Sequence, residues 1–173
     1  MVFSSIFRTF MQTKHYNFSA QHKLGKQGEQ IIDQWLQNIY KVTDVSDVPK
    51  YQEAGIDRII ERTDGTTATV EYKLDIAARR TGNLFFETVS VDTQGVPGWG
   101  WTSQADYWIF LIPDQEIIVI HPGKLRSLVW QHQTFLAERT VPNKNYKTLG
   151  VPVPLADIRK VAYQIQKLYL AGL

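Results

Sequence analysis

Residues 55–74 of the chain read Gly-Ile-Asp-Arg-Ile-Ile-Glu-Arg-Thr-Asp-Gly-Thr-Thr-Ala-Thr-Val-Glu-Tyr-Lys-Leu. Two β-branched runs, 56–62 and 66–74, flank the turn sequence Thr63-Asp64-Gly65. An Asp-Gly step between two such runs is typical of a β-hairpin. We therefore expect two antiparallel strands here, and the rest of the fold is interpreted outward from them.

Charged side chains interrupt this otherwise apolar hairpin. Because side chains alternate along a strand, Glu71 and Lys73 face the same side of the sheet, with apolar neighbours on the other side. Antiparallel pairing places the start of the first strand beside the end of the second, so Asp57 comes close to Glu71 and Lys73. Two carboxylates and an ammonium are thus predicted to share one place on the hairpin.

This group of residues is suited to a divalent metal. Mg²⁺ prefers oxygen ligands in an octahedral arrangement and keeps several waters, so Asp57, Glu71, the carbonyl of Tyr72 and a phosphate oxygen would satisfy it, with Mn²⁺ as a substitute. Lys73 can orient an attacking water, stabilise developing negative charge or act as a base. The chemistry that follows is metal-assisted hydrolysis of a phosphodiester.

Hydrophobic periodicity predicts the remaining elements around the hairpin. The apolar positions Ile31, Ile32, Trp35, Leu36 and Ile39 fall on one face of a helix. The expected helices span 28–40, 122–135 and 154–170; the expected further strands span 42–48 (a short edge strand), 83–91, 107–112 and 116–121; and 140–154 is expected to be a loop with one short strand at most. This order predicts an α/β fold with a mixed central β-sheet flanked by helices.

Composition excludes several classes of protein. The chain has 173 residues and no cysteine, which favours one domain and excludes disulfides, thiolate zinc sites, iron–sulfur clusters and cysteine nucleophiles. It has no nucleophile elbow, phosphate loop, dinucleotide fingerprint or His-Glu-x-x-His motif. The four histidines are too scattered in sequence to indicate a zinc site.

The N-terminal segment is the basic part of the chain. Arg8, Lys14, Lys23 and Lys26 give residues 1–28 a charge of +4 with no acidic residue, which leaves 15 basic and 17 acidic residues, or −2, for 29–173. We interpret 1–24 as an arm that packs or dimerises, or that binds nucleic acid or a membrane surface. No apolar run is long enough to span a membrane. We expect a cytoplasmic protein, although residues 1–20 also fit an organelle-targeting segment.

The hairpin residues resemble a known family. Gly55-Ile56-Asp57 followed by Glu71-Tyr72-Lys73, with Gly28-Glu29 on the preceding helix, resembles the PD-(D/E)XK nuclease superfamily, which includes restriction enzymes, archaeal Holliday-junction resolvases and a cyanobacterial-type homing endonuclease. The resemblance covers about residues 25–121 and departs from the motif at Ile56, where the family often has Pro.

The resemblance carries expectations for fold, domain and residues. It implies a restriction-endonuclease-like core in a single nuclease-like domain, 25–173, with the core motifs in 25–121 and C-terminal helices in 122–173. It implies that Asp57 and Glu71 bind the metal, that Lys73 is catalytic, and that Glu29 completes the metal shell. Glu87 and Ser90, on the next strand, are candidates for shaping the site.

Two further segments are candidates for DNA binding. Arg79 and Arg80 follow the second hairpin strand, where a loop could hold phosphate; Lys23 and Lys26 add charge from the N-terminal side. Trp99 and Trp101 belong to the glycine-rich stretch 94–103, whose rings could stack on bases or, alternatively, close the edge of the core.

The sequence therefore predicts a Mg²⁺-dependent DNA endonuclease that acts as a homodimer or higher symmetric oligomer, because cutting both strands requires two sites. A catalytically silent DNA-binding or assembly protein of the same fold is the alternative, and a protein that docks through residues 1–12 is a third. Under the silent alternative, Asp57 and Glu71 form ion pairs with Arg58, Arg62 or Lys73 on a half-exposed sheet.

Overall fold

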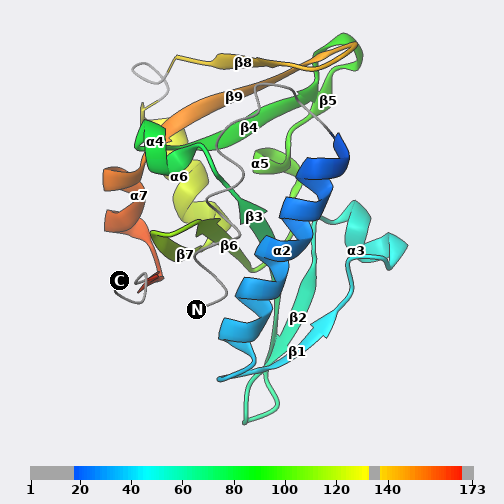
Figure 1. Cartoon of the computed structure of the whole chain (residues 1–173), viewed down its shortest axis with the longest axis vertical. Helices are drawn as coiled ribbons and strands as arrows, with labels where there is room; N and C mark the ends of the chain where they lie inside the picture. Colours follow the sequence, from blue (N-terminus) through cyan, green and yellow to red (C-terminus); the bar gives the residue numbers. More distant parts are fainter. Residues whose placement is uncertain (1–17, 133–136, 169–173) are drawn as a thin grey trace.

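The computed structural model of the chain describes residues 18–132 and 137–168, with side chains from residue 24 onward. In these ranges the fold is mixed α/β, with a six-stranded mixed sheet and a four-stranded antiparallel sheet (Figure 1). The predicted mixed central sheet flanked by helices is confirmed. The second sheet was not predicted.

The bounds of the elements follow chain order. The helices are α2 (Phe18–Leu36), α3 (Pro49–Glu53), α4 (Ala78–Thr81), α5 (Trp99–Thr102), α6 (Pro122–His132) and α7 (Leu155–Val161). The strands are β1 (Lys41–Asp44), β2 (Arg58–Glu61), β3 (Thr67–Leu74), β4 (Asn83–Val91), β5 (Val96–Pro97), β6 (Tyr107–Ile112), β7 (Glu116–Ile120), β8 (Arg139–Pro142), β9 (Lys147–Pro154) and β10 (Gln164–Lys167). The described residues contain no helix long and apolar enough to cross a membrane.

The hairpin predicted from residues 55–74 forms the middle of the central sheet. Strands β2 and β3 pair antiparallel, and the N–H of Arg62 donates to the carbonyl of Thr66 at 2.8 Å to close the turn, where Gly65 has φ of 82°. The strand order is β1-β2-β3-β6-β7-β10, and only the β3–β6 pair is parallel. The strand predicted over 42–48 is the edge strand β1, in a shorter form.

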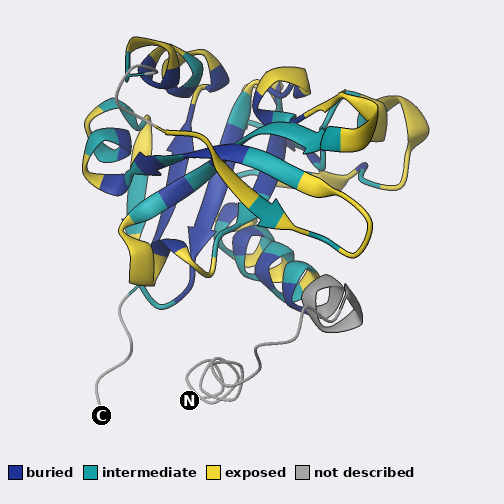
Figure 2. Cartoon of the chain, turned by 90° about the horizontal axis from the view of Figure 1, so that it is seen from above, coloured by how far each residue is buried: buried dark blue, intermediate teal, exposed yellow. Residues whose placement is uncertain are grey.

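The central sheet buries both of its faces (Figure 2). On one face lies α2, whose residues Ile32 and Leu36 pack against alternate residues of the sheet such as Val70 and Ile109. On the other face lie the second sheet, α6 and α7, which pack against the intervening residues, such as Trp108. A strand buried on both faces reads as a continuous apolar run, which is why 107–112 and 116–121 are so hydrophobic.

Helix α2 begins earlier than the sequence predicted. The helical pattern at 28–40 is confirmed as far as Leu36, but α2 starts at Phe18, inside the segment interpreted as an arm. The remainder of that segment, residues 1–17, lies outside the described residues.

The second sheet occupies part of the connection between β3 and β6, together with a later hairpin. Its strand order is β5-β4-β9-β8, and β4 matches the strand predicted over 83–91. The prediction that 140–154 is a loop was wrong, because β8 and β9 form a hairpin there. Pro152 and Pro154 obscured it. Both lie beyond the stretch of β9 that pairs with β8, so only β4 pairs with them, and a residue without an N–H is tolerated there.

The prediction of a helix over 154–170 was also wrong. Helix α7 ends at Val161, Ala162 adopts extended backbone with φ of −61° and ψ of 142°, and β10 then pairs antiparallel with β7. Glu116 of β7 explains the departure. It is fully buried and accepts hydrogen bonds from Nη2 of Arg159 and Nζ of Lys167, each at 2.5 Å. This long-range pairing outweighs the local helical pattern.

Candidate active site on the central hairpin

Strand β3 presents two charged side chains to the side of the central sheet that faces the second sheet. In the parallel ladder with β6, Glu71 pairs with Trp108 and Lys73 pairs with Phe110, and both aromatic rings belong to the core on that side. Glu71 is only 3% exposed, and the ammonium of Lys73 contacts its Oε1 atom. The Lys73 side chain is 27% exposed. The pair therefore lies where the core meets solvent.

Asp57 lies just before β2 and continues the β2–β3 ladder. Its N–H donates to the carbonyl of Val70 at 2.9 Å, and its Oδ2 accepts the N–H of Tyr72 at 2.6 Å. The carboxylate therefore takes the place that a backbone carbonyl would have if β2 extended further. The structure thus brings Asp57 beside the peptide that joins Glu71 to Tyr72. The backbone group of Tyr72 that Asp57 contacts is the amide.

A tight loop lies over Glu71. The Oε2 atom of Glu71 is buried and has no hydrogen-bond partner among the described residues. Gly55 lies next to it in left-handed backbone, φ 64°, and a Cβ at this position would come within 3.4 Å of Oε2 and 3.2 Å of Ser103. The Oγ of Ser103 donates to the Gly55 carbonyl at 3.2 Å and accepts from Nε1 of Trp108 at 2.8 Å. Ser103 thereby holds this loop against the sheet.

The glycine-rich stretch 94–103 packs on β4. A Cβ on Gly98 would come within 2.5 Å of the Glu87 carbonyl, and one on Gly100 would come within 2.5 Å of the Phe86 ring, so both positions require glycine. This close approach lets the Trp99 ring pack edge-on against the buried Trp108 ring, with the ring centroids 5.1 Å apart. These glycines have a packing role, which the sequence analysis did not identify.

Trp99 connects the packed loop to the charged pair. Nζ of Lys73 lies 5.0 Å from the centroid of the Trp99 ring, a cation–π distance. The N–H of Trp99 donates to Oε1 of Glu87 at 3.4 Å. Burial raises the pKa of the Glu87 carboxyl, and the nearby Glu71 adds to the effect, although the Trp99 N–H, Ser90 and Lys73 oppose it. Glu87 therefore belongs to the electrostatic environment of Glu71 and Lys73.

Arg126 of α6 anchors the stretch 94–103 through its backbone carbonyls. Its Nε donates to the carbonyl of Gly100 at 2.8 Å, and its Nη2 donates to the carbonyl of Ser103 at 2.6 Å. The guanidinium lies 5.1 Å from the Trp108 ring centroid. Burial lowers the pKa of Arg126, and the charge of Glu71 opposes that shift. Arg126 thus fixes α5 and contributes a positive charge near Glu71.

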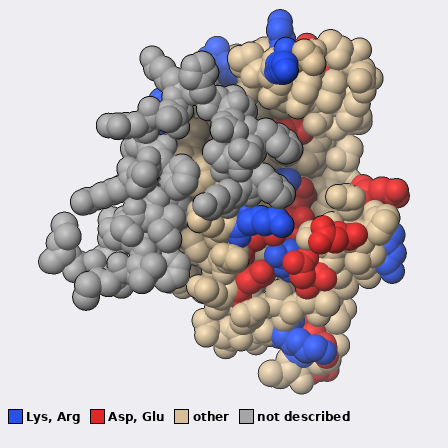
Figure 3. Space-filling model, turned by 45° about the vertical axis from the view of Figure 1, so that its right-hand side comes forward, with Lys and Arg blue, Asp and Glu red and all other residues tan. Residues whose placement is uncertain are grey.

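Glu29 lies on the opposite side of the central sheet. Arg58 is 3% exposed and lies under α2. It donates to Glu29 at 2.9 Å, to Asp33 at 3.1 Å and to Asp44 at 2.9 Å, which places three carboxylates around one guanidinium. Figure 3 shows a group of acidic side chains with basic ones among them on this side of the molecule. The structure does not bring Glu29 together with Glu71 and Lys73.

The ion network around Arg58 also includes Tyr72. Its hydroxyl donates to Oδ1 of Asp33 at 2.9 Å. Burial raises the pKa of the Tyr72 hydroxyl, and the Asp33 carboxylate raises it further. Burial on its own would lower the pKa of Arg58, but Asp33 and Glu29 raise it above its ordinary value. Consecutive β3 residues thus join separate networks on the two faces of the sheet.

The residues predicted to bind DNA are scattered. Arg79, on α4, pairs with Asp114 at 2.9 Å, and Arg80 is exposed beside it. Lys26 is exposed on α2, while the side chain of Lys23 lies outside the described residues. Trp101 is 42% exposed and packs edge-on against Phe86, and Trp99 is partly buried against the core. DNA binding by these residues stays a prediction.

The carboxylates of Asp57 and Glu71 are the side chains of this region that could serve as ligands of a hard cation. Among the described residues, Oε2 of Glu71 has no hydrogen-bond partner. Mg²⁺ commonly uses one or two carboxylates while keeping several waters. Within residues 18–132 and 137–168, no group of three or more His, Asp or Glu side chains is close enough together to hold a metal ion. Any metal here would therefore depend on Asp57 and Glu71, with the remaining positions filled by water or substrate.

Comparison of the chain with protein-family models, with curated proteins and with solved structures gives no match.

Sequence reasoning missed several residues that shape this region. Asp33 is four residues after Glu29 on α2, so helical spacing could have identified it as a neighbour. Ser103 and Arg126 gave no such signal, because their contacts join segments that are distant in sequence.

Proposed function

We propose that this chain is a metal-dependent DNA endonuclease of the PD-(D/E)XK type, and that Asp57, Glu71 and Lys73 form its cleavage site. The observation that carries the proposal is the state of Glu71. This carboxylate is 3% exposed, one of its oxygens contacts a lysine, and the other has no hydrogen-bond partner among the residues that the structure describes. Burying a carboxylate in this way costs folding free energy. A cation and a phosphate binding at this position would offset that cost.

The residues of the site would divide the chemistry between them. A bound Mg²⁺ would supply Lewis-acid stabilisation of the charge that develops on the phosphate. Asp57 and Glu71 would hold it, with Asp57 kept in position by its hydrogen bond from the Tyr72 N–H. Lys73, partly exposed beside Glu71, would orient the attacking water and stabilise negative charge. The Trp99 ring over Lys73 would limit the directions in which the ammonium can move.

The DNA would reach the site through its phosphates. Lys26 and Arg80 are exposed and are candidates for these contacts, with Arg79 available in exchange for its pair with Asp114. We propose a homodimer or higher symmetric oligomer, because cleavage of both strands requires two copies of the site.

The test is cleavage of plasmid, branched DNA and RNA in Mg²⁺ and in EDTA, with Glu71→Ala and Lys73→Ala beside the wild type. We expect DNA cleavage only with metal, and a loss of about 100-fold or more in each variant. Glu53→Ala and Lys124→Ala, at exposed positions, are matched controls that should cleave like the wild type. Cleavage in EDTA, or full activity in both site variants, would remove the proposal.

A catalytically silent DNA-binding or assembly protein is the other candidate. The close Glu71–Lys73 contact and the engagement of Glu29 by Arg58 favour it, because both can be read as structural ion pairs. It predicts metal-independent DNA binding with no cleavage of any of the three substrates.

A further inference from the structure

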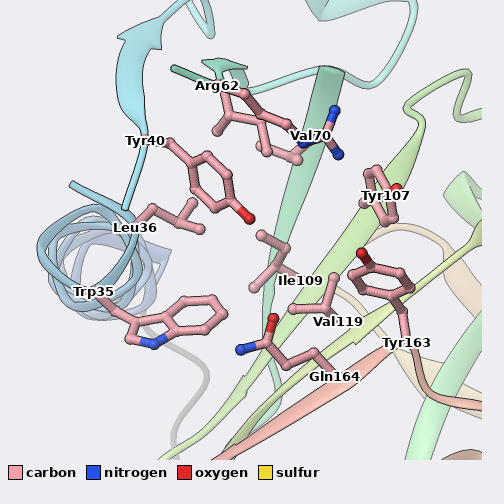
Figure 4. A pocket seen from close by; sticks show the side chains of 11 residues that line it. Trp35, Leu36, Tyr40, Arg62, Val70, Tyr107, Ile109, Val119, Tyr163 and Gln164 are labelled. Carbon is pink, nitrogen blue, oxygen red and sulfur yellow. The ribbon is translucent and has the colours of Figure 1, made fainter. Parts of the chain in front are cut away.

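A cleft lies on the α2 side of the central sheet, beyond the point where α2 ends (Figure 4). Its floor consists of aliphatic side chains from β2, β3, β6 and β7. Trp35 and Tyr40 lie on one side, Tyr107 and Tyr163 lie on the other, and Arg62 and Gln164 lie between them. The cleft is on the opposite face of the sheet from Glu71 and Lys73, because its floor residue Val70 belongs to the core under α2.

The cleft is shallow and open to solvent. Its cavity volume is about 20 Å³, which is room for a single water. A larger ligand would therefore lie in the mouth, against the rings. Tyr163 is 60% exposed there, and the ring centroids of Tyr107 and His121 lie 5.4 and 5.6 Å from its own. The mouth thus continues into a surface cluster of three rings.

Several polar side chains in the cleft have hydrogen-bond donors or acceptors that no other described residue uses. The only side-chain bond found for Arg62 in the described part of the chain is the one from Nη1 to the Thr66 hydroxyl at 3.3 Å, and Arg62 forms no ion pair there. Across the same residues, the side chain of Gln164 and the hydroxyls of Tyr40 and Tyr163 have no hydrogen-bond partner. A purely apolar ligand would make no use of these groups.

The combination of these groups indicates a class of ligand. The exposed ring of Tyr163 and the half-buried ring of Trp35 offer faces on which a planar base can stack. A guanidinium can bind phosphate in two-point fashion, and an amide can pair with the donors and acceptors of a base edge. Bases within a duplex have no exposed faces, so the ligand must be unpaired. We propose that this cleft binds an unpaired base of a single-stranded nucleic acid, with the ring against Tyr163 and Trp35 and the adjoining phosphate on Arg62.

This inference goes beyond the proposed cleavage activity and does not depend on it. The binding surface includes Tyr163, just before β10, and Gln164, the first residue of β10. This strand lies where the sequence predicted a helix. It would give the protein a contact for single-stranded segments on the face opposite the cleavage site.

The test is binding of a labelled oligothymidylate of about ten nucleotides, measured by fluorescence anisotropy in EDTA so that no cleavage can occur. We expect Tyr163→Ala and Arg62→Ala each to weaken binding by about tenfold. Tyr146→Ala and Arg139→Ala change the same residue types at exposed positions in or beside the second sheet and should bind like the wild type. A duplex of the same length should bind equally to all five proteins. Because Tyr163 is mostly exposed, its variant should remain folded, and circular dichroism checks this.

Each other outcome would overturn the proposal. No oligothymidylate binding by the wild type at about 100 µM would do so, as would equal affinities for all five proteins. A separate experiment adds free thymidine monophosphate as a competitor of the labelled oligothymidylate. If it competes as strongly as unlabelled oligonucleotide does, the ligand is a mononucleotide and not a strand. Cleavage tests of Glu71 and Lys73 use metal and different variants, so the two proposals fail independently.

Discussion

Nη2 of Arg58 donates a hydrogen bond of 2.9 Å to Oε2 of Glu29, on the α2 side of the central sheet. Arg58 is the first residue of β2 and directly follows Asp57, whose carboxylate accepts the N–H of Tyr72. The Arg58 network connects α2, β1 and β2 through Glu29, Asp33 and Asp44. Within the described residues, this engagement gives Glu29 a structural role that is independent of any metal.

We expect Arg58→Met to lower the free energy of unfolding by about 3 kcal/mol. The substitution keeps most of the apolar volume but leaves three carboxylates together without the guanidinium that neutralises them. Urea unfolding measures the change, with Arg139→Met, at an exposed position of β8, as the control. A loss no greater than that of the control would mean that the network contributes little to stability.

Glu87 gives a prediction for pH dependence. Burial raises the pKa of its carboxyl above the unfolded value of about 4.3, so the folded state binds the proton more tightly than the unfolded state does. Its contribution to stability is then largest below about pH 4.3 and falls as pH rises through the folded pKa. Glu87→Gln removes this titration and can still accept the Trp99 N–H.

We therefore expect Glu87→Gln to have the melting temperature of the wild type near pH 4 and a higher one at pH 8. Thermal unfolding across this pH range makes the comparison, with Glu53→Gln as an exposed control. A difference that shrinks with rising pH would contradict the raised pKa.

The close packing of the glycine-rich stretch on β4 gives a third prediction. Gly98→Ala would place a Cβ within 2.5 Å of the Glu87 carbonyl, so the loop must move away from β4. We expect a loss of about 2 kcal/mol in the free energy of unfolding. Gly123→Ala is the matched control, because no atom lies within 4 Å of its added Cβ. Equal stability of the two variants would show that the loop adapts without cost.

The sequence predicted local elements well and long-range arrangements less well. The Asp-Gly hairpin and the strands at 83–91 and 107–112 have strong local signals, and all are confirmed. The helix predicted over 154–170 was wrong because the buried Glu116 recruits Arg159 and Lys167, a contact that no local pattern encodes. The loop predicted over 140–154 was wrong because prolines in β9 hide a strand that has only one neighbour at those positions.

The candidate site shows the same division between local and long-range information. Alternation along β3 was enough to place Glu71 and Lys73 on one face. Hairpin pairing was enough to bring Asp57 to the peptide that joins Glu71 to Tyr72. Periodicity on α2 could not show which face of the sheet Glu29 approaches, because that depends on how the helix packs. Arg126 and Ser103 act through tertiary contacts alone, and the sequence carries no spacing that would reveal them.

The buried Glu71 oxygen without a partner gives a test of metal binding that needs no substrate. A cation that binds the folded state alone stabilises it by RT ln(1 + [L]/Kd), about 2.7 kcal/mol at a hundredfold excess over Kd. We expect Mg²⁺ or Mn²⁺ to raise the melting temperature of the wild type, and Glu71→Gln to abolish that rise, because the amide keeps the shape of the side chain and loses its charge. In the absence of metal, Glu71→Gln should melt at or above the wild type, since it removes a buried carboxylate that lacks a full set of partners.

Glu29→Gln separates the two roles predicted for Glu29. If Glu29 binds metal, the metal-dependent rise in melting temperature becomes smaller in the variant. If Glu29 serves Arg58 alone, that rise is unchanged, while the melting temperature without metal drops. An equal metal-dependent rise in the wild type and Glu71→Gln would place any bound cation elsewhere on the molecule.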